Sequence, residues 1–301
     1  MIALAGPLVS LAVVASGCAP SPSLAPGDDR PVVVAAVYPL GYAASRVVGD
    51  LAQVDVLVPP GTEPHDYELS GRQVASLRSA TLVVYQAGLD AALDQAVTQA
   101  AHAVVETGSL VTLRPSVAGV EDPSNAYGYD PHTWLDPTYM ATFAAAIATE
   151  MGRLDPARAA AYQANATAFQ ADLTSLDADY RTGLTGCRTS TFLTTHAAFG
   201  YLADRYNLTQ LAIAGVGAEN EPSPKHLGEL AVQARTHGLT TVFFETLLSP
   251  DYATTLADDL GLRTDVLDPI EGVTASSRGS DYLAIMRANL AALKQANGCT
   301  R

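Results

Sequence analysis

The sequence predicts an α/β protein of two lobes, each with a mainly parallel sheet, joined by one long rigid helix. In both halves, apolar runs of strand length alternate with segments of helical periodicity, as in parallel sheets with crossover helices. Between the halves, an Ala-rich helical pattern runs from Ala157 to about Arg181. A helix of about 25 residues spans almost 40 Å, so it can link two lobes as a rigid spine.

The first lobe is expected over residues 31–155. Its strands are predicted as short β-branched or apolar runs, at Val32–Val37, Val54–Val58, Thr81–Tyr85 and Ala103–Val105. Helices should follow three of them: one ends near Val48, one is capped by Ser70, and one covers Asp90–Ala100. After a loop over 107–131, a helix is expected from Pro137 to about Leu154.

The linking helix is assigned to residues 156–184, since Asp155-Pro156 ends one helix and suits the start of another. The second lobe, residues 185–301, repeats the alternation. Its predicted strands are Ser190–Thr194, Gln210–Ala214, Thr241–Phe244 and Arg263–Leu267. Its predicted helices are Ala197–Tyr206, Lys225–His237, Pro250–Leu260 and 281–297.

Residues 1–18 have the pattern of an export signal, being apolar and ending in Ala15-Ser16-Gly17-Cys18. A small-small-Cys ending resembles the lipobox of bacterial lipoproteins, which predicts a lipidated Cys18. Residues 19–30 are a Pro/Ser/Gly tether. No Lys or Arg precedes Arg30, so a start upstream of Met1 stays open. The other two cysteines, Cys187 and Cys299, form an even pair and are expected to be bridged in an exported protein.

Composition limits the classes of partner. Hydrophobic residues make up 48% of the 301 residues, and the formal net charge is −14. A phosphate-binding surface needs a basic face, so this composition argues against nucleic acid as a partner.

Four polar stretches lie at or after predicted strand ends, where open α/β sheets bind ligands. They contain His65, His132, His196 and Asp268. Three imidazoles and one carboxylate form a donor set that suits zinc better than magnesium or calcium. The strand-end Glu245 is the alternative oxygen ligand. Their wide spacing excludes a local zinc finger and favours a site assembled from the loops of an α/β fold.

Motifs in this order resemble the substrate-binding lipoproteins of bacterial ABC importers for zinc and manganese. The matching segments cover nearly the whole mature chain: residues 59–68, 132–137, 195–199, 221–224, 242–245 and 267–269. The resemblance implies two α/β lobes with the metal in the cleft between them. It assigns His65 and His132 to the first lobe and His196 and Asp268 to the second.

In this family, manganese binders tend to carry a carboxylate at the third position and zinc binders a histidine, so His196 points to zinc. Many zinc members carry a His-rich loop before the second ligand, whereas residues 107–131 contain no histidine. This difference argues against an auxiliary metal-capturing loop.

The resemblance therefore implies a monomeric extracytoplasmic receptor that captures Zn²⁺ and delivers it to an ABC permease without catalysing a reaction. It is expected to be anchored to the outer face of the membrane by Cys18, or to be periplasmic. The alternatives are a manganese- or iron-binding member, a zinc-dependent hydrolase, or an adhesin on the same scaffold. A hydrolase needs an open zinc position and a nearby general base. The sequence has no His-Glu-x-x-His motif and no Gly-x-Ser-x-Gly motif.

Overall fold

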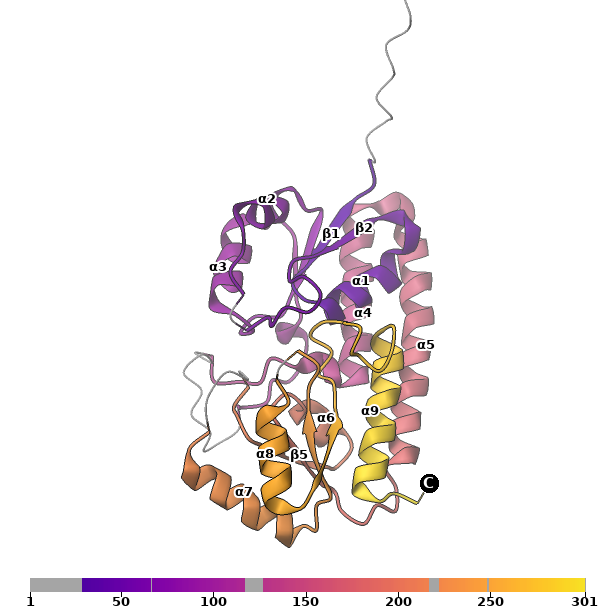
Figure 1. Cartoon of the computed structure of the whole chain (residues 1–301). Helices are drawn as coiled ribbons and strands as arrows, with labels where there is room; N and C mark the ends of the chain where they lie inside the picture. The colour runs from indigo at the N-terminus through magenta and orange to yellow at the C-terminus, as the bar shows by residue number, and fades with distance from the viewer. Residues whose placement is uncertain (1–28, 66, 117–126, 217–221, 248, 301) are drawn as a thin grey trace, which may run out of the picture.

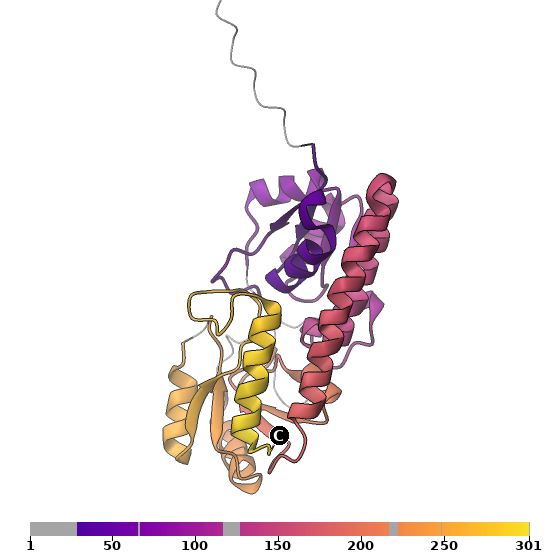
Figure 2. The same cartoon turned by 90° about the vertical axis from the view of Figure 1, so that its right-hand side faces the viewer.

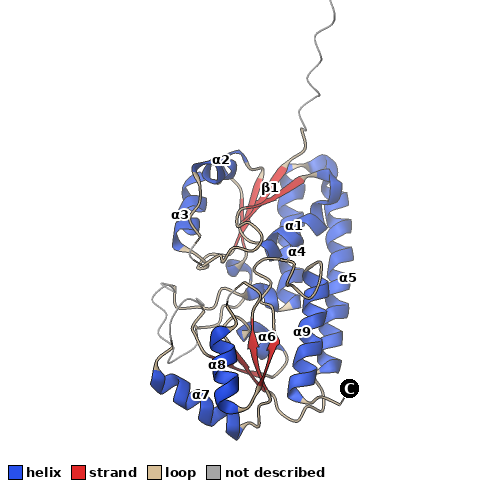
Figure 3. Ribbon diagram, in the orientation of Figure 1, coloured by secondary structure: helices blue, strands red, loops and turns tan. Residues whose placement is uncertain are grey.

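The computed structural model describes residues 29–65, 67–116, 127–216, 222–247 and 249–300. Two α/β lobes follow one another along the chain, and each contains a four-stranded parallel sheet (Figures 1 and 3). The two-lobe prediction is confirmed. Residues 1–18 with Cys18, and the tether up to residue 28, lie outside the described residues. Within the described ranges, no helix is both long enough and apolar enough to span a membrane.

The first sheet has the strand order β2-β1-β3-β4. Its strands are β1 (Val32–Ala35), β2 (Gln53–Val56), β3 (Leu82–Tyr85) and β4 (Val104–Glu106). Its central strands are the most apolar, and Val33 and Val34 are fully buried. They carry the near-continuous β-branched runs typical of a strand covered on both faces.

The helices of the first lobe are α1 (Tyr38–Val48), α2 (Gly71–Ser79), α3 (Ala91–Ala100) and α4 (Pro137–Leu154). Short 3₁₀ turns cover Gly49–Leu51, Gly108–Leu110, Thr133–Leu135 and Pro156–Arg158. Ser70 forms a capping box with Gln73 at the start of α2. Asp136 caps α4 by accepting a hydrogen bond from Thr138 N at 2.7 Å. These caps explain why the helix starts could be predicted to within a residue.

The second sheet has the order β6-β5-β7-β8, which matches the first. Its strands are β5 (Thr191–Thr194), β6 (Thr209–Ala212), β7 (Thr241–Phe244) and β8 (Arg263–Val266). Its helices are α6 (Gly200–Arg205), α7 (Pro224–Thr236), α8 (Asp251–Leu260) and α9 (Tyr282–Asn297). Helix α6 is shorter than predicted, because residues 197–199 form a turn that carries the chain away from His196.

The long helix α5 (Ala159–Gly183) runs along both lobes (Figure 2). It packs on α1 and α4 of the first lobe and on α9 of the second. The face predicted from periodicity is the buried one: Tyr162, Ala166, Phe169, Leu173, Leu176 and Tyr180. The hydroxyl of Tyr180 donates to Met286 O at 2.6 Å, which ties the C-terminal end of α5 to α9.

A disulfide joins Cys187, just before β5, to Cys299, just after α9. The cysteines are 112 residues apart. In the chain-entropy model, a loop of this length stabilises the fold by up to about 5 kcal/mol, and often by less.

For the chain from residue 19 onward, unfolded without reductant, we expect no reactive thiol, and two thiols after reduction. A thiol-reactive dye read by mass spectrometry measures this. Two labelled thiols before reduction would show that the bridge is absent.

Candidate metal centre

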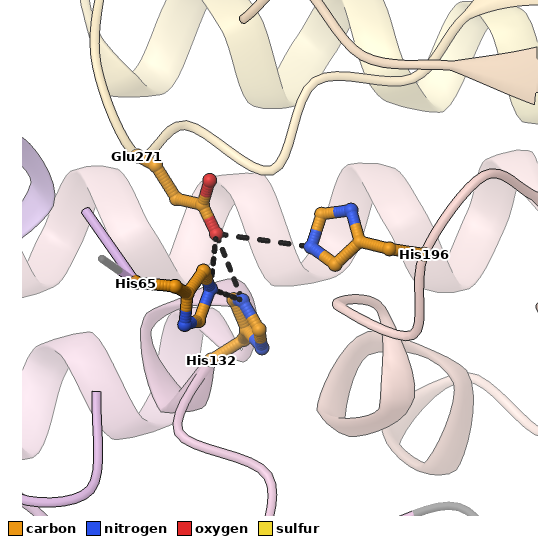
Figure 4. Close-up of side chains that lie close together, drawn as sticks. All are labelled: His65, His132, His196 and Glu271. Atoms are coloured by element: carbon orange, nitrogen blue, oxygen red, sulfur yellow. Dashed lines mark hydrogen bonds and ion pairs between the residues drawn. The ribbon is translucent and has the colours of Figure 1, made fainter. Parts of the chain in front are cut away.

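Three histidines and one glutamate converge between the lobes (Figure 4). His65 lies in the loop after β2, and His132 lies before the Thr133–Leu135 turn. His196 follows β5, and Glu271 follows β8. Each lobe thus supplies two of the four side chains. All four residues are buried, with exposed fractions of 7%, 0%, 2% and 1% in that order.

The four side chains have the spacing of a metal-ligand set. Glu271 Oε1 lies 2.8 Å from His132 Nε2, 3.2 Å from His65 Nε2 and 3.8 Å from His196 Nε2. Zinc bonds of 2.0–2.2 Å in tetrahedral geometry place ligand atoms about 3.4 Å apart. His196 Nε2 and Glu271 Oε2 are buried and have no hydrogen-bond partner among the described residues. The donor set therefore fits a tetrahedral cation in both spacing and chemistry.

Each imidazole is oriented through its other ring nitrogen. His65 Nδ1 lies 3.2 Å from Leu89 O, His132 Nδ1 lies 2.8 Å from Asp130 Oδ1, and His196 Nδ1 lies 2.6 Å from Glu245 Oε1. An acceptor at Nδ1 favours the tautomer that carries its proton there. That tautomer leaves the Nε2 lone pair free to bind a metal.

Asp268, the oxygen ligand expected from the sequence, lies outside this group. Its carboxylate accepts hydrogen bonds from Ile270 N at 2.8 Å and from Thr246 Oγ1 at 3.2 Å. Its backbone N donates to Asn289 Oδ1 at 2.9 Å. These bonds hold the Asp268 carboxylate in the turn, and the carboxylate that lies among the three histidines is that of Glu271, three residues later.

The turn that presents Glu271 is unusual in its backbone. Ile270 has φ +65° and is fully buried, a conformation that a β-branched residue rarely adopts. Trp134 Nε1 donates to Pro269 O at 2.8 Å, and the hydroxyl of Tyr282 donates to Trp134 O at 2.6 Å. These bonds tie the turn to the segment that carries His132.

Glu245, the alternative oxygen, also lies outside the group of four. Its Oε1 accepts from His196 Nδ1, and its buried Oε2 has no hydrogen-bond partner in the part of the chain that the structure describes. Glu245 thus orients His196. No periodicity or spacing in the sequence marks Glu271 as a member of this group; its position close behind Leu267-Asp268-Pro269 was the one available signal.

The electrostatics of the site favour a cation. Burial lowers the pKa of His132, but hydrogen bonds to Asp130 and Glu271 raise it to about 10. Burial raises the pKa of Glu271, but hydrogen bonds from His132 and His65 hold it well below its usual value. Burial, followed by repulsion from Glu271 and Glu245, raises the pKa of Glu63 to about 9. Without a metal, protons therefore supply the positive charge that the carboxylates require.

The fold and this donor set define a two-lobed α/β binding protein with a candidate metal site between the lobes. The chain belongs to the family described as zinc-uptake complex component A, periplasmic, whose model matches residues 33–296.

Relatives and solved structures agree with this assignment. The chain is 32% identical over 280 residues to the zinc-binding lipoprotein AdcA of Streptococcus pneumoniae (strain TIGR4), covering 89% of this chain and 56% of that protein. It therefore spans about half the length of this relative. It is 30% identical over 282 residues to the high-affinity zinc uptake system protein ZnuA of Bacillus subtilis (strain 168), covering 88% and 87%.

Among solved structures, the Zn(II)-bound ZnuA-like domain of S. pneumoniae AdcA matches with a TM-score of 0.75 and 31% identity, over 89% of this chain and 99% of that one. The laminin-binding protein Lmb of Streptococcus agalactiae matches with a TM-score of 0.78 and 33% identity, over 88% and 98%. That protein is described as bifunctional, with adhesin and metal transporting activity.

Proposed function

We propose that this protein captures Zn²⁺ with His65, His132, His196 and Glu271 and delivers it to the permease of an ABC importer. The observation that carries the proposal is the convergence of three imidazole Nε2 atoms on one buried carboxylate. Membership of the zinc-uptake family supports it. Three nitrogen donors and one oxygen donor suit zinc better than harder cations.

The division of the ligands between the lobes suggests how capture works. A cation bound to all four side chains would hold the lobes together, because two ligands come from each. Binding replaces the protons of the metal-free site with one dication. The ion is exchanged and is not chemically changed. Separation of the lobes would divide the ligand set and lower the affinity, which provides a route to release.

The rival classes have less support. A zinc hydrolase needs a general base next to a metal-bound water, whereas the strand-end carboxylate of Glu245 is hydrogen-bonded to His196 Nδ1. Adhesion stays a prediction, prompted by the laminin-binding proteins among the similar structures. The lipid anchor on Cys18, the extracytoplasmic location and the monomeric state belong to the proposal. The name lipoprotein carried by the S. pneumoniae relative supports the anchor.

Native mass spectrometry of the chain from residue 19, with zinc and manganese in competition, tests the proposal. We expect a zinc adduct to dominate when the two metals are present at equal concentration, because imidazole nitrogen favours zinc over manganese. A dominant manganese adduct, or no retained metal, would contradict it.

We expect one tight zinc site per chain, because residues 107–131 contain no histidine. The described chain holds a second acidic group of Glu63, Glu245 and Glu271, but it shares Glu271 with the histidine site. Two ions would therefore compete for that carboxylate. Calorimetric titration should give a stoichiometry near one, and two sites of comparable affinity would argue against this account.

A further inference from the structure

Arg114 reaches from the first lobe to the second beside the metal centre. It lies in the segment after β4, and its Nε donates to Asp204 Oδ2 on α6 at 3.0 Å. Its Nη1 lies 3.6 Å from Asp130 Oδ2. The Arg114 side chain is 27% exposed, whereas that of Asp130 is 1% exposed. One guanidinium thus lies between a carboxylate of the second lobe and a buried carboxylate of the first.

Asp130 connects this guanidinium to the metal centre. Its Oδ1 accepts hydrogen bonds from His132 N at 2.9 Å and lies 2.8 Å from His132 Nδ1. Its Oδ2 is buried and has no hydrogen-bond partner among the described residues, so the nearby charge of Arg114 offsets an otherwise costly buried anion. The carboxylate that orients His132 is therefore itself held by Arg114.

The backbone reinforces the connection to α6. Asp130 N donates to Arg114 O at 3.0 Å. The hydroxyl of Tyr201, on α6, donates to Asp130 O at 2.7 Å and accepts from Arg114 N at 3.1 Å. Arg114 and Asp130 are thus anchored to the same helix of the second lobe, and a movement of α6 would reach both.

Gly200, the first residue of α6, leaves the space that the guanidinium fills. A Cβ at this position would overlap Arg114 Nη1 and lie 2.6 Å from Asp130 Oδ2. Because Nη1 is the far end of a flexible side chain, Gly200→Ala should push the guanidinium out of this space. The chain keeps its arginine at position 114, and only the position of the charge changes.

We propose that Arg114 is a positioning residue that couples the docking of α6 to the orientation of His132, and so sets how long the bound zinc is retained. This inference rests on the proposed zinc-binding function. With α6 in place, Asp204 and the space at Gly200 hold the guanidinium beside Asp130, and Asp130 holds His132. When α6 moves away, Arg114 loses its anchor and His132 loses part of its support. Lobe separation would then loosen a first-lobe ligand as well as remove the second-lobe ones.

The test compares zinc dissociation from the chain starting at residue 19, after mixing with an excess of chelator. Loss of a residue that supports a metal ligand from outside typically weakens metal binding about 10–100-fold. Arg114 contacts Asp130 and not the ligand His132 itself. We therefore expect Arg114→Gln to speed dissociation by about 10-fold, the low end of that range. Arg114→Lys should release zinc more slowly than Arg114→Gln but faster than the wild type, because lysine keeps the positive charge and lacks the planar guanidinium.

The matched control is Arg46→Gln. Arg46 is 30% exposed and pairs with Asp172 at 2.7 Å, so it joins α1 to α5 in a similar salt bridge that does not involve the metal ligands. We expect zinc dissociation from this variant to match the wild type. The rise in melting temperature that zinc produces, measured for each variant against its own zinc-free form, should be smaller in Arg114→Gln and unchanged in Arg46→Gln.

Gly200→Ala tests the same connection from the second lobe. It should speed dissociation, because the added Cβ displaces the guanidinium and crowds Asp130 Oδ2, and both contacts support His132 through Asp130. Dissociation from Arg114→Gln and Gly200→Ala at the rate of the control would overturn the inference. A wild type that retains no zinc would instead refute the proposed function, and this inference with it.

Discussion

Replacing His132 with alanine is expected to abolish tight zinc binding. His132 Nε2 lies 2.8 Å from Glu271 Oε1 and 3.3 Å from His65 Nε2, at the centre of the buried group. The substitution removes one of four donors and leaves Asp130 without the imidazole that it orients. The loss of affinity should exceed the roughly 10–100-fold that removal of a supporting residue costs.

Competition against a chelator of known zinc affinity measures this loss. The control is His102→Ala, because His102 is exposed and stands before β4, at the opposite end of that strand from the metal centre. Glu271→Ala should weaken zinc binding strongly as well. If His132→Ala binds zinc as tightly as the control variant does, the four-residue site is wrong.

Zinc affinity should rise with pH well above neutrality. In the metal-free site, hydrogen bonds to Asp130 and Glu271 outweigh burial and raise the pKa of His132 to about 10. Burial lowers the pKa of His196, but Glu245 outweighs it and leaves that pKa raised too. Zinc binds only neutral imidazole, so each bound ion displaces protons from this site. If the imidazoles were unperturbed, with a pKa of about 6.5, the rise of zinc affinity with pH would be confined to lower pH.

The affinity should therefore increase by about one power of ten per pH unit for each displaced proton between about pH 6.5 and 10. Calorimetry in buffers of different ionisation enthalpy counts the protons released. Asp130→Asn removes a contact that raises the pKa of His132. In this variant, the pH range over which zinc affinity rises should therefore move to lower pH. Zinc binding at pH 8 without proton release would contradict the prediction.

The same shift makes the stability of the metal-free protein depend on pH. Because His132 has a higher pKa folded than unfolded, its contribution is fully present below about pH 6.5 and is lost as the pH rises towards 10. The stability of the zinc-loaded protein does not include this contribution, since its His132 imidazole is neutral. Zinc should therefore raise the melting temperature more at pH 9 than at pH 7, which thermal unfolding with and without the metal can measure.

Much of the fold was predictable because the chain marks its elements locally. Helix α4 has the predicted bounds Pro137–Leu154, since Asp136 caps its start and Asp155-Pro156 ends it. The buried face of α5 follows directly from its helical periodicity. The start of α6 was harder to place, because residues 197–199 have helical composition but form the turn that positions His196.

The three histidines that the structure brings together could be named from the sequence, because each lies in a recognisable motif. The carboxylate that lies among them could not. Two carboxylates lie three residues apart, and which of them enters the site depends on the turn between them. Ile270 takes a left-handed conformation, and Asp268 binds Ile270 N. Sequence patterns do not predict a positive φ at a β-branched residue.

A crystal structure of the zinc-loaded chain, with anomalous data collected at the zinc edge, would identify the ligands themselves. We expect one anomalous peak between the lobes, with zinc about 2.0–2.2 Å from Nε2 of His65, His132 and His196 and from a carboxylate oxygen of Glu271. A peak bound by Asp268 or Glu245 in place of Glu271, or no peak at this position, would contradict it.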